Sequence, residues 1–341
     1  MKNLKYTIIR LALITVLFFV LNEIYLFTFW KSDVHKHADT LENLWNIPTD
    51  SDAIYFGESS NFHETANDLK KHRISEILDT LIEKDKISTL DNAGLHAGTY
   101  LAMLQNLPSN MKLKYIIVTM NMRSFGQVWI NSDFETNLSK LERLVALRPK
   151  LWNRFMISLN EYDLKSSEER KQNLLKAFRE DKIHVKGLPF NTIDEWDFAI
   201  ANAQWQGVRQ FKNEFETLLA TQYVKNFAFE INPKTNPRIA NFDAIVEWAN
   251  SRNCEVFFNI LGENMEEGAE LVGPTITSML KKNRDLVVSR YSRKGAIMVD
   301  NLSQIPDRCF ADRNWPTEHY ELEGKKIVAK NLANAIQKRN F

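Results

Sequence analysis

Short apolar segments alternate with helical patterns between residues 54 and 120, and this alternation constrains the fold more than any other feature of the chain. The apolar segments cover residues 54–56, 87–90 and 115–120, and their length and their β-branched and aromatic content are typical of buried strands. Between the first two, apolar residues at positions 74, 77, 78, 81 and 82 have the spacing of one helix face. The order strand, helix, strand, helix, strand predicts parallel strands joined by right-handed crossovers.

The same pattern returns late in the chain, with predicted strands at 255–261 and 296–300. The fold class is therefore predicted as α/β, a flavodoxin-like three-layer sandwich with about five parallel strands. Strand signals are scarce in between, and helical stretches rich in Leu, Phe and Trp predict an insertion over the carboxyl edge of the sheet. Most of its aromatic residues are expected to be core. The predicted domains are an anchor at 1–30, a linker at 31–50, the α/β domain at 51–126 and 250–341, and the insertion at 127–249.

The amino-terminal segment predicts a membrane anchor. Three basic residues among the first ten precede a continuously apolar run, which resumes after Asn22 and Glu23 and continues to Trp30. The segment has about the 20 residues that a membrane-spanning helix needs, and no small-residue cleavage site follows the apolar run as it would in a signal peptide. A buried core helix is the alternative. Basic residues ahead of the span predict a cytoplasmic amino terminus and an exported domain in a single-pass protein of the inner membrane.

Composition excludes some other classes. The net charge of the 341 residues is +1, and no basic stripe with interleaved aromatic residues predicts nucleic-acid binding. The two cysteines, Cys254 and Cys309, flank opposite ends of predicted parallel strands, too far apart for a disulfide. They are expected to be free thiols. The sequence has no metal-ligand spacing and no dinucleotide or phosphate-binding glycine motif, so we expect no metal and no cofactor.

The stretch that ends the first strand contains the first candidate catalytic residue. Ser59 follows Gly57 and Glu58 at the edge where open α/β sheets build their sites. A serine there acts as a nucleophile if a histidine reaches it and amide groups face the oxyanion. The alternative is that Ser59, Ser60 or Asn61 only caps the next helix.

Three further candidate segments come after later predicted strands. Gly94 and Gly98 come after the second strand and Asn121 comes after the third, while His319 lies just before the last helix with Asp312 upstream. This order of residues resembles the hydrolase superfamily named for its Ser, Gly, Asn and His blocks, also called GDSL-type esterases. Gly57-Glu58-Ser59 is similar to that family's Gly-Asp-Ser, with Glu in place of Asp.

The resemblance implies a role for each block. Ser59 would attack an ester carbonyl after giving its proton to His319, and Asp312 would orient the imidazole. The backbone N–H groups of Ser59 and Gly98 and the side-chain amide of Asn121 would bind the oxyanion. We prefer Gly98 to Gly94 because it directly precedes a helix, whose amino terminus favours negative charge.

Four residues leave alternatives open. The family usually places its acid three residues before the histidine, but this chain has Pro316 at that position. Glu318, directly adjacent to His319, is the alternative to Asp312 as the acid. His63 could compete as the base, although a histidine on a helix surface is the simpler interpretation. Arg123 could bind an anionic group or form a structural ion pair.

The resulting hypothesis is a serine esterase or O-acyltransferase that acts on an ester-bearing glycan or other cell-envelope polymer, beside a membrane-bound O-acyltransferase. Two alternatives remain: a catalytically silent, membrane-anchored scaffold for a glycan or such an acyltransferase, and a lipid esterase that faces the cytoplasm.

Overall fold

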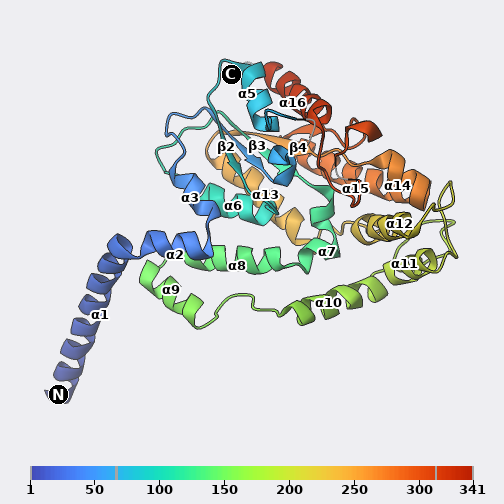
Figure 1. Ribbon diagram of the computed structural model, residues 1–341. Helices are drawn as coiled ribbons and strands as arrows, with labels where there is room; N and C mark the ends of the chain where they lie inside the picture. Colours follow the sequence, from blue (N-terminus) through green and yellow to red (C-terminus); the bar gives the residue numbers. More distant parts are fainter. Residues whose placement is uncertain (1, 66–67, 312, 340–341) are drawn as a thin grey trace.

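A computed structural model describes residues 2–65, 68–311 and 313–339. Its centre is a sheet of five parallel strands in the order β2-β1-β3-β4-β5 (Figure 1), which is the flavodoxin-like order. The strands are β1 Ala53–Gly57, β2 Ile87–Asp91, β3 Tyr115–Met120, β4 Glu255–Ile260 and β5 Ile297–Asp300. Each predicted strand is present with its ends displaced by at most one residue, and the predicted fold class is confirmed.

The sheet is buried on both faces, so its central strands are apolar at consecutive positions. In β1, Ile54 and Phe56 belong to one apolar cluster while Ala53 and Tyr55 belong to a second. Successive side chains of a strand point to opposite faces, and full burial on both faces is the condition of a parallel sheet covered by crossover helices. Apolar residues of α6, α13 and α15 join the first cluster, and those of α5 and α16 join the second.

The chain order of the remaining elements is simple. The helices are α1 Lys2–Thr28, α2 Trp30–His37, α3 Thr40–Trp45, α4 Ser59–Phe62, α5 Ile74–Ile82, α6 Ala97–Gln105, α7 Gln127–Ile130, α8 Asp133–Val145, α9 Lys150–Ser158, α10 Ser167–Glu180, α11 Ile193–Ala201, α12 Glu214–Phe227, α13 Pro237–Ser251, α14 Met265–Val272, α15 Pro274–Arg293 and α16 Leu322–Gln337, with 3-10 turns η1 Met122–Phe125 and η2 Asp307–Cys309.

Helices α7 to α12 occupy the stretch between β3 and α13, where an insertion was predicted. They share the apolar cluster on the first face of the sheet, through residues such as Leu141 and Trp196. Helix α8 contacts α6, and α12 contacts α14 and η1, which follow the carboxyl ends of β4 and β3. The predicted domain limit at 249/250 falls inside α13, which packs against α6 and β4. The division into domains remains a prediction.

The predicted linker at 31–50 is wrong. Helices α2 and α3 fill most of it, and Val34, Leu41 and Leu44 are buried in the same cluster as the sheet. The local composition is mixed and polar because only one side of each short helix faces the core. Tertiary packing, which a local pattern does not reveal, decides this segment.

Helix α1 extends away from the body of the molecule (Figure 1). Within the described residues, Leu4–Thr28 is long and apolar enough to cross a membrane, and its most apolar window has no buried residue. The helix is long and apolar enough to be a membrane span or a signal anchor, and a signal sequence meets the same criteria. Its carboxyl end contacts α2 and α9.

Candidate active site

Ser59 lies at the carboxyl edge of the sheet because β1 ends abruptly at Gly57. A Cβ atom at Gly57 would lie 2.8 Å from Cε1 of Tyr55 and 3.3 Å from Cβ of Asp91, so only glycine fits there without displacement of neighbours. Ser59 then begins the short helix α4 and is partly exposed, whereas Glu58 and Ser60 on either side are buried. The turn thus presents one hydroxyl at the sheet edge.

The capping alternative for this stretch is not what the structure contains. The N-cap position of α4 is Glu58, which makes no side-chain capping bond. Asn61 instead joins α4 to α5 and to the end of β2 by hydrogen bonds. Its Oδ1 accepts from the Ser75 N–H at 2.8 Å, and its Nδ2 donates to Asp91 at 2.6 Å. Arg73 also donates to Asp91, at 2.8 Å, so α4 is held against α5 and the end of β2.

His319 lies directly against Ser59, although the two residues are 260 positions apart. Its Nε2 is 3.0 Å from the Ser59 Oγ, within the range expected for a nucleophile and its base. A pair of backbone contacts shapes the loop that carries His319: the Ala311 N–H donates to the His319 carbonyl at 2.9 Å, and Phe310 forms an antiparallel bridge with Tyr320. The ring of His63 stacks on that of His319, with centroids 3.9 Å apart and 7° between the planes. His63 therefore borders the pair.

The predicted acid, Asp312, lies outside the described residues, and its role remains a prediction. Glu318, the adjacent alternative, is engaged elsewhere. Its Oε1 accepts from Arg123 Nε at 2.6 Å and its Oε2 accepts from Arg123 Nη2. Both side chains are buried. Of the two interpretations of Arg123, the structure contains the ion pair.

Asn121 lies beside the Ser59 loop, at the start of η1. Its Oδ1 accepts from the Arg123 N–H at 2.9 Å, and its Nδ2 donates to Glu58 Oε2 at 3.3 Å. A carboxamide has two N–H donors, so one remains for another acceptor after the bond to Glu58. These contacts fix the amide group next to the residue that precedes the nucleophile.

Gly98 lies in the first turn of α6, and its N–H donates to the ring Nδ1 of His96, the N-cap residue, at 3.3 Å. This amide is therefore already bonded within the loop. Gly98 also packs closely, since a Cβ there would lie 2.5 Å from Leu138 and 2.9 Å from Asn241. Its predicted oxyanion role is untested, and Ala97, the first residue of the helix, presents the neighbouring amide.

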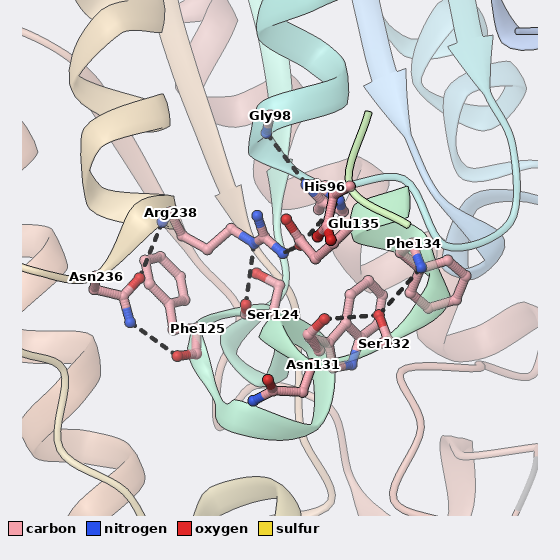
Figure 2. Close-up of polar contacts among 12 residues, drawn as sticks. His96, Gly98, Ser124, Phe125, Asn131, Ser132, Phe134, Glu135, Asn236 and Arg238 are labelled. Carbon is pink, nitrogen blue, oxygen red and sulfur yellow. Dashed lines mark hydrogen bonds and ion pairs between the residues drawn. The ribbon is translucent and has the colours of Figure 1, made fainter. Parts of the chain in front are cut away.

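Helices of the insertion region hold the loops after β2 and β3 together through His96, Glu135 and Arg238 (Figure 2). Arg238 is fully buried; its Nε donates to the Ser124 carbonyl at 3.1 Å and its Nη2 donates to Glu135. Glu135 Oε1 is 3.6 Å from His96 Nε2. Burial and the charge of Arg238 hold the pKa of His96 well below its ordinary value, so this imidazole is neutral and structural.

Three buried acidic side chains, Glu58, Glu263 and Glu318, lie close enough to Arg123 for their charges to act on it. Burial and the charge of Glu318 raise the pKa of Glu58 to about 7, and the same two causes raise the pKa of Glu263 well above its usual value. Burial by itself would raise the pKa of Glu318 too, but the charge and hydrogen bonds of Arg123 hold it below the ordinary value. As the pH rises, the first member of the cluster to ionise is thus Glu318, which is paired with Arg123. Sequence reasoning missed Glu263, for which no local motif gives a signal.

No group of three or more His, Cys, Asp and Glu side chains with metal-binding geometry occurs in the part of the chain that the structure describes. Cys254 and Cys309 are free thiols, both buried.

The fold and the site define a class: a five-stranded, flavodoxin-like α/β protein with a serine and a histidine in contact at the carboxyl edge of its sheet. No family model and no curated protein matches the sequence. Among solved structures, the chain is similar to a GDSL-like lipase from Bacteroides thetaiotaomicron, at 8% identity and a TM-score of 0.38 over 89% of this chain and 97% of that one. It is also similar to an alpha/beta hydrolase enzyme from the metagenome of Lake Arreo, at 11% identity and a TM-score of 0.35 over 85% and 97%. Likenesses this remote carry no conclusion about activity.

Proposed function

We propose that the protein is a serine-dependent esterase or O-acyltransferase, anchored in the membrane, which acts on an ester-bearing glycan or similar cell-envelope polymer outside the cytoplasm. The observation that carries the proposal is the 3.0 Å separation between Ser59 Oγ and His319 Nε2. Asn121, held next to the nucleophile loop by Glu58, supplies an amide donor of the kind that stabilises an oxyanion.

The reaction follows from these positions. Ser59 Oγ attacks the ester carbonyl carbon while its proton passes to His319 Nε2, and the carbonyl electrons move onto oxygen. The tetrahedral intermediate collapses, and the alcohol leaves with the proton from His319. A second hydroxyl, from water or from a sugar, then gives its proton to His319 and attacks the acyl-serine carbonyl carbon. The second tetrahedral intermediate collapses, Ser59 Oγ leaves with the proton from His319, and an acid or a new ester is released. Transfer requires the sugar to outcompete water.

The anchor motivates the location and the partner. A membrane-tethered acyl-transferring domain would receive acyl groups from a membrane-bound O-acyltransferase in the same bilayer. This partnership, like the glycan acceptor, rests on the predicted anchor and the resemblance of the motifs.

The test is ester hydrolysis by the full-length protein in detergent, with p-nitrophenyl acetate as substrate. We expect S59A and H319A to lose activity by about 10³-fold or more, since residues of a triad act as a unit. The matched controls are S167A and H184A, which remove an exposed serine and an exposed histidine remote in sequence from the site and should leave the rate unchanged. Equal rates in wild type, S59A and H319A would overturn the enzyme and leave the anchored scaffold.

A further inference from the structure

Helix α9 has an exposed apolar face at the point where α1 joins the body of the molecule. Trp152, Phe155 and Leu159 are 42%, 50% and 57% exposed, and Leu147 in the preceding loop is fully exposed. Positions 152, 155 and 159 lie on one side of a helix. The opposite side is buried, through Asn153 and Ile157. Three large apolar side chains exposed on α9, with a fourth in the loop before it, require an explanation.

The contacts between α1 and α9 fix where this face lies relative to a bilayer. Asn22 of α1 accepts a hydrogen bond from the Leu151 N–H in the first turn of α9, at 3.1 Å. The ring of Phe18 meets that of Trp152 edge to face, with centroids 6.5 Å apart. Both Phe18 and Asn22 belong to the membrane-span candidate Leu4–Thr28. Helix α9 therefore begins beside the anchor itself.

The length of α1 sets the depth of that contact. At 1.5 Å per residue, residues 4–21 extend about 27 Å, close to the roughly 30 Å of a hydrocarbon core. Lys5 and Arg10 lie in the first turns of this stretch, where their long side chains carry the charges back to the cytoplasmic interface. Asn22 and Glu23, the polar interruption of the apolar sequence, then fall at the outer interface. The hydrogen bond from Asn22 to Leu151 thus places the start of α9 at the level where the bilayer ends.

Charge in the same segment is complementary to lipid headgroups. Residues 143–159 contain four basic residues, Arg143, Arg148, Lys150 and Arg154, and no acidic residue. Arg154 also pairs with Asp33 of α2 at 3.0 Å, which ties α9 to the segment that follows the anchor. An apolar face with Trp and Phe, flanked by cations, is the composition of a helix that lies in a membrane interface.

We propose that α9 is an interfacial helix: the face formed by Leu147, Trp152, Phe155 and Leu159 is covered by the headgroup and upper acyl region of the bilayer that α1 spans. The anchor and α9 together hold the domain in one orientation on the membrane, where a single span followed by a free linker would let it tumble. This placement goes beyond the esterase chemistry and is independent of it.

The test measures lipid contact at Phe155. The full-length F155C variant is labelled with an environment-sensitive fluorophore and reconstituted into phosphatidylcholine–phosphatidylglycerol vesicles. The native cysteines are buried, and the labelled wild type gives the background. The matched control is F198C on α11, which replaces another exposed phenylalanine, 61% accessible, on a helix remote in sequence from α1. A12C on α1 reports on the span, and L159C is the second variant on α9.

We expect lipids brominated near the headgroup to quench the labels at 155 and 159 several-fold more than the label at 198. Iodide added on both sides of the vesicle membrane should instead quench the label at 198 more strongly than the labels at 155 and 159. Labels at 155 and 159 that are as accessible to iodide as the label at 198 would overturn the proposal. So would protection from both quenchers, which means that protein covers the face, or a label at position 12 that no brominated lipid quenches. Loss of ester hydrolysis would not affect any of these readouts.

Discussion

At the scale of single residues, Glu58, which precedes the candidate nucleophile Ser59, is an acidic group whose protonation depends strongly on the fold. Glu58 is 2% exposed and shares its surroundings with Glu318 and Glu263. Its hydrogen bond to Asn121 links this carboxyl to the amide that is the candidate oxyanion donor. A change in the charge of Glu58 therefore reaches both the stability of the protein and the position of Asn121.

The raised pKa of Glu58 predicts a stability that falls as pH rises. The folded protein holds the proton up to about pH 7, while the unfolded chain releases it near 4.5. Unfolding therefore releases a proton between these two pH values. The resulting loss of stability is complete above pH 7 and is on the order of 3 kcal/mol. The E58Q variant lacks this loss, so its thermal midpoint should rise relative to wild type from pH 5 to pH 7.5. E266Q, at an exposed position, is the control. A difference in thermal midpoint between E58Q and wild type that is the same at pH 5 and pH 7.5 would contradict the prediction.

The ion pair between Arg123 and Glu318 joins the loop after β3 to the residue beside His319. R123A leaves the buried Glu318 carboxylate without its partner, which typically costs about 3–5 kcal/mol. We expect a large drop in thermal midpoint for R123A and a smaller one for the double variant R123M/E318L, which removes both charges. R308A, which breaks an exposed pair with Glu323, should change little. A double variant as unstable as R123A would show that the ion pair itself, and not the stranded charge, is responsible.

At the scale of elements, α2 and α3 show how a segment between an anchor and a domain becomes part of the core. Leu41 is 2% exposed and packs in the cluster that covers one face of the sheet. L41A should destabilise the protein by about 2–5 kcal/mol because it leaves a cavity. L69A, at a leucine that is 92% exposed, is the matched control. Equal thermal midpoints for the two variants would mean that residues 31–50 are the flexible linker that their composition suggests.

At the scale of the whole molecule, the proposed orientation of the chain across a membrane would decide which substrates it meets. Lys2, Lys5 and Arg10 precede the apolar run, and basic residues remain on the cytoplasmic side. We expect a carboxyl-terminal alkaline phosphatase fusion to be active and the corresponding cytoplasmic reporter fusion to be silent. Replacement of the three basic residues with alanine should weaken this preference. The opposite reporter pattern would favour the cytoplasm-facing lipid esterase.

The sequence by itself determined the five strands, the helix α5 and the order of the site motifs. These features depend on local patterns: buried parallel strands are continuous apolar runs, a helix face repeats at 3.6 residues, and polar residues collect where strands stop. The sequence also predicted that Ser59 and His319 lie at one edge of the sheet, because the carboxyl ends of parallel strands are all at the same edge.

Only the tertiary structure decided the pairings that no local pattern contains. Arg123 and Glu318 are 195 positions apart, and the N–H of Gly98 is bonded to His96, which Glu135 and Arg238 help to hold in place. Likewise, the apolar residues of the mixed segment 31–50, such as Val34, Leu41 and Leu44, are buried, whereas the apolar face of α9 is exposed. Burial and charge pairing depend on which distant elements pack against a residue, and the free energy of those contacts outweighs local propensity.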